Sequence, residues 1–455
     1  MSIEGSLTNL RKNSSIALED SLLRNALKTA TDMFAAKRDY GLSTIPFEEW
    51  RLRASLIRDH VLENLEELVS EFTFKATQAG AVTHRAKDAD QAAQLILDLL
   101  KDNGARKLVK AKSMVSEEIH LNYILQSHGI RVVETDLGEY IVQLAGETPS
   151  HILAPAIHKN RSQVGRLFSE KLGVEYSEDP EILTKIARRA LRREFETADA
   201  GFSGVNFAVS SSGSIAIFTN EGNGRMCTTI PPLHIALLTI EKMLPTLADL
   251  ALFTKLLPRS ATGQFLSSYM SVITGTRKTG ESTGARRLHI ILLDNGRSQI
   301  LKSPFREILK CIRCSSCMNV CPVYRVIGGH AYESTYSGPM GVVLTNLLEG
   351  LEKAHPLLDA STLCGACDEV CPVMIPLSKL ISLLREKHVA TNMILSLESI
   401  LMSYFGSVVR HPMLFGISQK IARKTLPIAK HLSKKARLDR LPSISQKTFR
   451  ELKSR

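Results

Sequence analysis

Seven of the eight cysteines fall between Cys311 and Cys371, and this clustering constrains the fold more than any other feature of the chain. Disulfide frameworks belong to small secreted proteins, whereas this chain has 455 residues and begins without the apolar segment of a secretory signal. Clustered thiols in a chain of this size therefore indicate metal binding. The separate Cys227 is expected to be a small buried hydrophobic side chain.

Two cysteine motifs predict two iron–sulfur clusters. The first is Cys311-x2-Cys314-x2-Cys317-x3-Cys321-Pro322, the spacing of bacterial ferredoxins, in which the cysteine before proline binds the other cluster. The second is Cys364-x2-Cys367-x3-Cys371-Pro372. With the same crossing, one cluster is expected on Cys311, Cys314, Cys317 and Cys371, and the other on Cys321, Cys364 and Cys367.

The second motif lacks its first cysteine, because Ser361 stands at that position. Either the second cluster has three irons, or it is a 4Fe–4S cluster whose last iron takes a ligand other than cysteine. Serine oxygen is a harder donor than thiolate, so Ser361 is not the favoured ligand. His330 either packs near this cluster or binds it. Zinc is the weaker interpretation, because zinc sites usually use separated pairs of ligands.

The length predicts two or three domains. A helical region is expected at 1–75, where apolar residues recur every three or four positions. Runs rich in β-formers, such as 129–134 and 214–218, alternate with helical stretches such as 180–195, which predicts an α/β domain at 76–300. A mostly helical ferredoxin-type domain with both clusters should follow at 301–388, and a basic helical tail at 389–455.

The net charge of +12 resides almost entirely in the tail. From Leu401 to Arg455 there are thirteen Lys and Arg against two acidic residues, a net +11, which leaves about +1 for the rest. A basic amphipathic helix either docks an acidic partner, the favoured interpretation, or lies on an anionic membrane surface. Aromatic residues are only 5% and no nucleic-acid motif is present, so no nucleic acid is expected. No window is apolar enough to span a membrane, so a cytoplasmic protein is expected; the membrane alternative for the tail would place it at the inner membrane face.

The segment from Thr219 to Arg225 is a candidate anion-binding loop. Glu221, Asn223 and Arg225 follow a predicted strand, and exposed amides with a guanidinium can hold a carboxylate or phosphate. The alternative is a tight turn with charged rim residues. The loop contains neither a Walker motif nor a GxGxxG fingerprint, so no nucleotide is implied.

Other polar residues have plainer interpretations. Glu117 and Glu118 are expected to begin a solvated helix capped by Ser116. Four histidines are candidate proton carriers for oxidation of a 2-hydroxy acid, although a lone histidine is more often structural: His120, His151, His158 and His234.

The stretches CIRCSSCMNVCPVYRVIGGHAYESTYSGPMG and STLCGACDEVCPVMIPL resemble the lactate-utilisation iron–sulfur protein B family (LutB-like), as do KSMVSEEIHLN and NEGNGRMCTTIPPLHIALLTIEK. The resemblance implies a lactate-utilisation (LUD) domain related to the CoA-transferase and sugar-phosphate-isomerase α/β fold. It implies two 4Fe–4S clusters and an electron-carrier role beside A- and C-type partner proteins in oxidising L-lactate to pyruvate. One departure is Ser210 to Ser214, where relatives often place Glu-Thr before Gly-Ser.

Two other functions stay open. The chain could itself be the 2-hydroxy-acid dehydrogenase, although no flavin or nicotinamide motif supplies a hydride acceptor. It could also be a non-enzymatic iron–sulfur sensor or interaction protein. The sequence identifies no catalytic residue, so it leaves open whether the chain is an enzyme.

Overall fold

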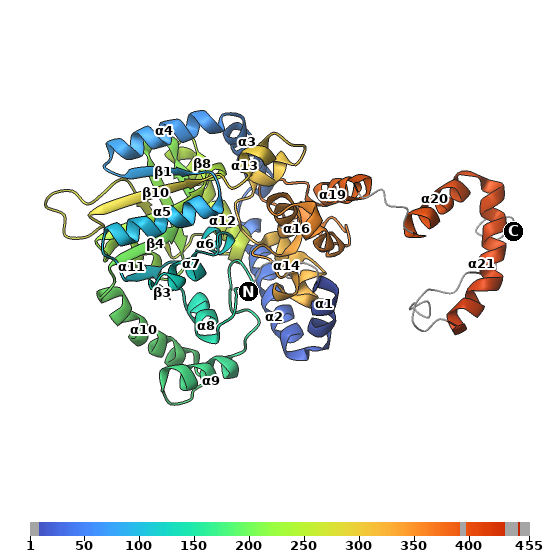
Figure 1. Ribbon diagram of the computed structural model, residues 1–455, viewed down its shortest axis with the longest axis horizontal. Helices are drawn as coiled ribbons and strands as arrows, with labels where there is room; N and C mark the ends of the chain where they lie inside the picture. The colour runs from blue at the N-terminus through green and yellow to red at the C-terminus, as the bar shows by residue number, and fades with distance from the viewer. Residues whose placement is uncertain (1–8, 392–396, 433–444, 446–455) are drawn as a thin grey trace. The chain divides into compact units, whose positions relative to one another are not determined.

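The computed structural model describes residues 9–391, 397–432 and 445 (Figure 1). These residues belong to two compact units, residues 1–388 and 389–455. The first unit contains two sheets and all of the cysteines.

A six-stranded parallel sheet forms the centre of the first unit. Its strand order is β1-β10-β7-β4-β2-β3, and every neighbouring pair is parallel. Successive side chains of a strand point to opposite faces, and the central strands β7 and β10 are buried on both faces, so these two strands are mostly apolar. The edge strand β1, with the sequence VTHRA, is partly exposed. The strands are β1 (Val82–Ala86), β2 (Lys107–Lys110), β3 (Arg131–Glu134), β4 (Ala200–Gly204), β7 (Leu233–Thr239) and β10 (Arg287–Leu293).

Helices cover both faces of this sheet. One face packs against α5 (Ala89–Asp102), α6 (Met114–Glu118) and α7 (Leu121–Ser127). On the other face, α4 (Leu65–Gln78) covers the β10–β7 end. The β2–β3 end of that face packs against α8 (Leu137–Ala145), α9 (Arg161–Leu172), α10 (Pro180–Glu196) and α11 (Asn223–Thr229). The predicted α/β class is therefore confirmed.

A smaller four-stranded sheet lies beside α4, in the order β8-β5-β6-β9. Its strands are β5 (Phe207–Val209), β6 (Ser214–Thr219), β8 (Met243–Leu244) and β9 (Tyr269–Ile273). β6 pairs antiparallel with β5 and β9, while β8 joins β5 in parallel. Two short 3-10 helices adjoin this sheet: η3 (Ser210–Ser212) links β5 to β6 within it, and η4 (Ile240–Lys242) links β7 of the six-stranded sheet to β8.

The N-terminal helices pack against the cysteine region, although some 250 residues separate them in sequence. Helix α2 lies beside α12, α14 and α15, as Figure 1 shows for the blue and orange segments. These helices and the cysteine region share one apolar core. They are α1 (Leu10–Glu19), α2 (Ser21–Ser43), α3 (Phe47–Glu63), α12 (Leu247–Thr262), α13 (Arg297–Leu301), η5 (Arg306–Lys310), α14 (Ser316–Val320), α15 (Tyr324–Ile327), η6 (His330–Tyr332), α16 (Gly338–Leu348), α17 (Leu351–Ala354), η7 (His355–Asp359), α18 (Ala366–Glu369) and α19 (Leu377–Thr391).

Arg58 joins three parts of the chain in this core. Its guanidinium is fully buried and donates hydrogen bonds to the carbonyl oxygens of Met243 (3.0 Å), Leu309 (2.9 Å), Lys310 (3.3 Å) and Glu241. Because Lys310 directly precedes Cys311, Arg58 ties α3 both to η4 and β8 and to the start of the first cysteine motif.

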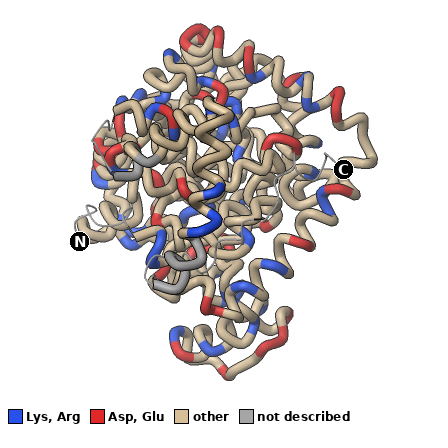
Figure 2. Tube along the Cα trace, turned by 90° about the vertical axis from the view of Figure 1, so that its right-hand side faces the viewer, with Lys and Arg blue, Asp and Glu red and all other residues tan. Residues whose placement is uncertain are grey.

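The second unit contains α20 (Leu397–Arg410) and α21 (Pro412–Leu432). Apolar side chains on both helices are exposed, among them Met402, Tyr404, Met413 and Ile421. The end of the basic tail, residues 433–455 apart from Ser445, lies outside the described residues and includes Arg437 to Arg455. Elsewhere acidic and basic residues are interspersed along the trace (Figure 2). Among the helices that the structure describes, none is long and apolar enough to cross a bilayer.

Candidate functional site

The first cysteine motif folds as a tight loop followed by α14. Arg313 (φ 60°) and Ser315 (φ 63°) adopt the left-handed conformation, which bends the chain between successive cysteines. α14 then carries Cys317 and ends at Cys321. The bends turn the thiols of this loop toward one side.

Four thiols from the two motifs line one small cavity: those of Cys311, Cys314, Cys317 and Cys371. Backbone N–H groups donate to two of the sulfurs, Arg313 N to Cys311 Sγ (3.4 Å) and Ile375 N to Cys371 Sγ (3.3 Å). Such donors stabilise a thiolate and tune the potential of a cluster bound to it.

Burial disfavours the thiolate form of these cysteines when no metal is bound. It raises the pKa of Cys314 to about 11 and that of Cys371 to about 12, and neighbouring cysteine charge contributes in both cases. Without a metal they would be neutral at pH 7, whereas a bound cation deprotonates a coordinating thiol. The cavity therefore provides thiol ligands in an environment that favours metal-bound thiolates over free ones.

The other three cysteines of the region form a second group. Burial raises the pKa of Cys367, and the charges of Asp368, Cys321 and Cys364 add to this, so these side chains are close neighbours. Cys364 is exposed, whereas Cys321 and Cys367 are buried. Ser361, at the position of the missing cysteine, accepts a hydrogen bond at its Oγ from Leu363 N (3.2 Å).

The thiol groups suit clusters better than single ions. In a cluster each thiolate binds a different iron, so the thiols surround a cavity rather than one point. The four-thiol cavity and its amide donors fit this requirement.

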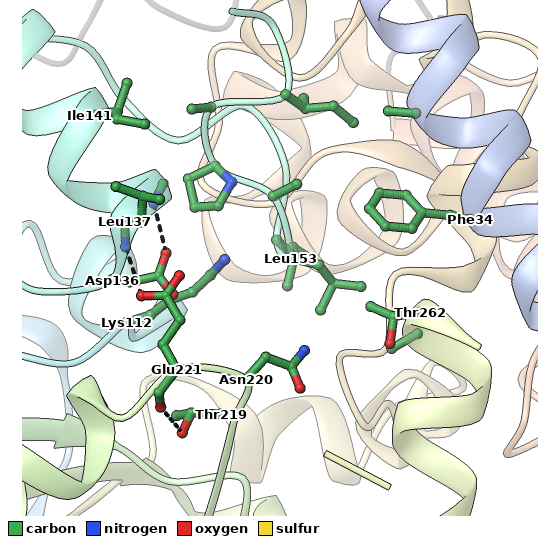
Figure 3. Close-up of a pocket in the computed structure, with 18 of the residues that line it drawn as sticks. Phe34, Lys112, Asp136, Leu137, Ile141, Leu153, Thr219, Asn220, Glu221 and Thr262 are labelled. Carbon is green, nitrogen blue, oxygen red and sulfur yellow. Dashed lines mark hydrogen bonds between the residues drawn. The ribbon is translucent and has the colours of Figure 1, made fainter. Parts of the chain in front are cut away.

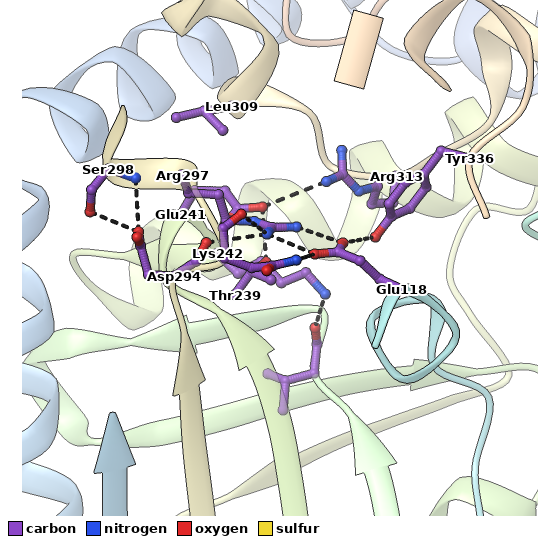
Figure 4. A network of polar contacts seen from close by, with 12 residues as sticks. Glu118, Thr239, Glu241, Lys242, Asp294, Arg297, Ser298, Leu309, Arg313 and Tyr336 are labelled. Carbon is purple, nitrogen blue, oxygen red and sulfur yellow. Dashed lines mark hydrogen bonds and ion pairs between the residues drawn. The ribbon is translucent and has the colours of Figure 1, made fainter. Parts of the chain in front are cut away.

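A buried ionic network connects the parallel sheet with the first thiol cavity (Figure 4). Arg297 binds Glu118 through two nitrogens (2.8 and 2.9 Å) and lies 3.1 Å from Glu241. Tyr336 donates to Glu118 Oε2 (2.6 Å), and Arg313 lies 3.6 Å from Glu241 and 5.0 Å from the Tyr336 ring. Burial alone would raise the pKa of Glu118, but the charge and hydrogen bonds of Arg297 outweigh it and lower the pKa to about 2.

A second, much larger cavity of about 1180 Å³ lies at the carboxyl ends of the central strands. The segments after β2 and β4 both line it, and the strand order changes direction between these two strands. In open α/β sheets, ligands bind at this position. The cavity also borders α2 and α12, so residues from 22 to 313 contribute to its wall.

Polar groups gather at one end of this large cavity (Figure 3). Burial and the charge of Asp136 raise the pKa of Glu221 to about 7, although Leu137 N donates to Glu221 Oε2 (3.2 Å). Lys112 Nζ and Asn223 Oδ1 are buried there and have no hydrogen-bond partner among the residues that the structure describes. The wall opposite is apolar and includes Leu22, Met33, Phe34, Ile152, Leu153 and Leu257.

Arg313 lines both cavities. Its backbone N–H donates to Cys311 Sγ, while its side chain reaches the large cavity and the ionic network. The large cavity and the thiol cavity are therefore separated at this point by a single residue.

Two family models match the chain, a LUD domain at residues 69–293 and a 4Fe-4S dicluster domain at residues 307–375. Lactate utilization protein B of Lysinibacillus sphaericus is 44% identical over 408 residues, covering 89% of this chain and 86% of that protein. This chain belongs to the lactate utilization protein B family. The dicluster match shows that the chain is an iron–sulfur protein. Together with the names of its relatives, this match supports an electron-transfer role.

Other relatives agree with the family. A protein of Escherichia coli K12 named uncharacterized electron transport protein YkgF is 46% identical over 390 residues, covering 86% of this chain and 82% of that protein. Among solved structures, a DUF162 family protein from Deinococcus radiodurans matches 50% of this chain and 98% of its own, with 16% identity and a TM-score of 0.30.

The structure brings together only part of the predicted anion-binding loop. Glu221 and Asn223 line the large cavity, and Asn223 begins α11. Arg225 instead lies exposed with its guanidinium 5.5 Å from the Tyr269 ring, and it does not line the cavity.

The expected solvated helix at Glu117 and Glu118 is wrong. Ser113 rather than Ser116 caps this helix, because its Oγ accepts from Ser116 N (3.2 Å). Glu117 binds the buried Lys110 (2.9 Å), and Glu118 is buried against Arg297. Lys110 precedes Glu117 by only seven residues, on β2, whereas Arg297 follows Glu118 by 179 residues, and a local charge pattern does not reveal such a distant partner.

The remaining candidates have structural partners. Cys227 is fully buried, which raises its pKa to about 12, in agreement with the expected hydrophobic role. His234 lies 2.8 Å from Ser203 Oγ, and His151 lies 3.0 Å from Asn319. His330 lies 2.7 Å from the carbonyl oxygen of Thr148, and His158 lies 2.6 Å from Glu147. His120 is exposed.

Proposed function

We propose that this chain is the iron–sulfur electron-transfer subunit of a complex that oxidises L-lactate to pyruvate. One observation carries the proposal: Cys371, from the second motif, lines the same cavity as the three cysteines that begin the first. Exchange of one cysteine between two motifs is the arrangement of proteins with two clusters. The names of relatives, lactate utilization protein B and electron transport protein, support the substrate and the role.

Two 4Fe–4S clusters are proposed, each with its own ligands. The first takes Cys311, Cys314, Cys317 and Cys371, and the second takes Cys321, Cys364 and Cys367. With three cysteines, the second cluster either has a ligand other than cysteine on its fourth iron or has three irons. Clusters supply one-electron carriers, and the chain's own residues bury the thiolates and direct amide N–H groups at their sulfurs.

The partners are proposed to be A- and C-type lactate-utilisation proteins. The basic tail would dock one of them, or contact the membrane, by attraction to acidic groups. The domain borders at 75, 300 and 388 and the cytoplasmic location also stay predictions.

A second function is that the chain itself oxidises the 2-hydroxy acid. The large cavity favours it, because it lies where α/β sheets bind ligands and is separated from the thiol cavity only by Arg313.

The test is anaerobic purification with iron and sulfide analysis, followed by L-lactate addition with and without the partner proteins. Two clusters predict about seven to eight irons per chain with matching sulfide. Bleaching that requires the partners supports the carrier role, and bleaching by lactate alone supports the dehydrogenase. A zinc-loaded protein without the brown colour of iron–sulfur clusters contradicts both functions, and a cluster-loaded protein that lactate never bleaches indicates a sensor.

A further inference from the structure

Three tyrosines of the cysteine region are buried, and their hydroxyl groups differ in hydrogen bonding. The O–H of Tyr324 donates to Ser150 O (2.8 Å), and that of Tyr336 donates to Glu118 Oε2 (2.6 Å). Tyr332 is only 1% exposed, but its hydroxyl has no hydrogen-bond partner among the residues that the structure describes. A buried tyrosine hydroxyl usually has a partner, because an unsatisfied buried donor destabilises the folded protein. The Tyr332 hydroxyl therefore needs an acceptor other than the protein groups described around it.

Close packing holds Tyr332 in the core. Tyr332 ends η6, and its N–H donates to Gly329 O (3.0 Å). A Cβ at Gly329 would lie 1.9 Å from Ser150 O, so the two segments approach this closely only because glycine stands there. The Tyr332 ring lies 6.4 Å from the Tyr324 ring, in the apolar core that includes the cysteine region. The hydroxyl is thus fixed where it has no access to bulk water.

Cysteines of both proposed clusters are neighbours of the Tyr332 side chain. Burial raises the pKa of Tyr332 well above its usual range. The charges of Cys321, Tyr324 and Cys317, in decreasing order, raise it further, so these groups are close. The hydroxyl is therefore a neutral O–H donor at pH 7 rather than a phenolate that could bind iron itself. Neither cysteine Sγ accepts a hydrogen bond from it, whereas an iron–sulfur cluster brings further sulfur acceptors, its inorganic sulfides, to the same region.

We propose that the Tyr332 hydroxyl donates a hydrogen bond to a sulfur of the cluster held by Cys321, and that this bond raises the reduction potential of that cluster. The proposal rests on the two-cluster function and deepens it by naming a residue that adjusts one potential. Reduction adds one negative charge to a cluster, and an O–H donor stabilises the more negative state more strongly. A higher potential favours movement of an electron from the Cys311 cluster to this one, of which Cys364 is exposed. Tyr332 thus directs electrons toward the cluster that has a ligand at the surface.

The test is an anaerobic redox titration of the full-length protein, in which paramagnetic resonance follows each cluster. Loss of one signal in Cys364→Ala identifies the cluster of Cys321. Tyr332→Phe removes only the hydroxyl oxygen, and it should lower the ratio of reduced to oxidised Cys321 cluster at a fixed potential about tenfold, which is a shift of about 59 mV for one electron. The other potential should not change. Tyr324→Phe is the matched control, because this tyrosine is as deeply buried in the same core but already donates to Ser150 O, and it should change neither potential.

A second variant separates the effect of the hydroxyl from that of packing. Tyr332→Met removes the O–H with a side chain of different shape and should lower the same potential by a similar amount. Iron content identifies any variant that has lost a cluster. Unchanged potentials in both variants of Tyr332, or an equal fall in Tyr324→Phe, would overturn the proposal and leave the two-cluster function in place. A natural protein that holds only one cluster would overturn the two-cluster function, and this proposal with it.

Discussion

Replacing Arg297 with methionine would remove the cation that holds two buried carboxylates, Glu118 and Glu241. Arg297 is fully buried, and Glu118 and Glu241 have side-chain exposures of only 6% and 2%. Removing one partner of a buried ion pair typically costs about 3–5 kcal/mol, because the other charge stays buried. The pKa of Glu118 gives a similar magnitude: its fall from 4.5 to about 2 corresponds to roughly 3 kcal/mol at 1.36 kcal/mol per pH unit.

The pH dependence should change sign in this variant. In the natural protein, the folded pKa of Glu118 lies below its unfolded value, so its stabilisation is complete above about pH 4.5 and is lost as pH falls toward 2. Without Arg297, burial dominates and raises the folded pKa of this carboxyl above 4.5. The folded variant then binds more protons than the unfolded chain, so its loss of stability is greatest at pH 7 and shrinks toward pH 5.

The assay is urea unfolding followed by circular dichroism at pH 5, 6 and 7, with iron content measured in parallel. Arg192→Met is the matched control, because Arg192 forms an exposed pair with Glu196 (2.9 Å) worth about 0.3–0.5 kcal/mol. An Arg297→Met protein as stable as this control at pH 7, or equally destabilised at pH 5 and pH 7, would refute the reasoning.

Three further predictions concern the clusters, the large cavity and the tail. Cys371→Ala should remove the cluster of the first motif and spare that of Cys321, as judged by paramagnetic resonance; loss of only the second cluster would contradict the crossed assignment. Asp136→Asn should lower the pKa of Glu221 from about 7, because a neighbouring negative charge is lost, and infrared titration of the carboxyl band would show no change if burial acted alone. Residues 437–455 lie outside the described residues apart from Ser445, and deleting them should slow association with the partner at low salt. The difference in association rate should shrink as salt shortens the screening length below about 8 Å. Equal rates at low salt would exclude docking by the tail.

The sequence predicted the features that depend on local pattern. The runs 129–134 and 214–218 correspond to β3 and β6, because both contain the β-branched residues that are enriched in strands. The helix at 180–195 corresponds to α10, where Asp179 caps a strongly amphipathic segment. The cysteine spacing likewise identified the iron–sulfur class, because consecutive ligands lie within one loop.

The missed features depend on partners far apart in the chain. Glu118 looked solvated because its partners, Arg297 and Tyr336, follow it by 179 and 218 residues. No sequence motif marked Lys112 or Arg313 as a cavity residue. Lys112 simply follows a predicted strand, and Arg313 is one of the residues between two cysteines of the first motif. Only the order of strands brings the segments after β2 and β4 together around the large cavity.

The packing of α2 against the cysteine region also determines the order in which the protein can be completed. Leu27 is fully buried, and its side chain lies against Gly328, about 300 residues later. At ribosomal rates of about 5–20 residues per second, Leu27 is made roughly 15–60 s before Gly328. During synthesis the apolar face of α2 is therefore exposed until the cysteine region has been made, and α2 is the segment that chaperones would need to bind. The clusters can reach their native packing only late in folding, after the N-terminal helices have packed against the cysteine region.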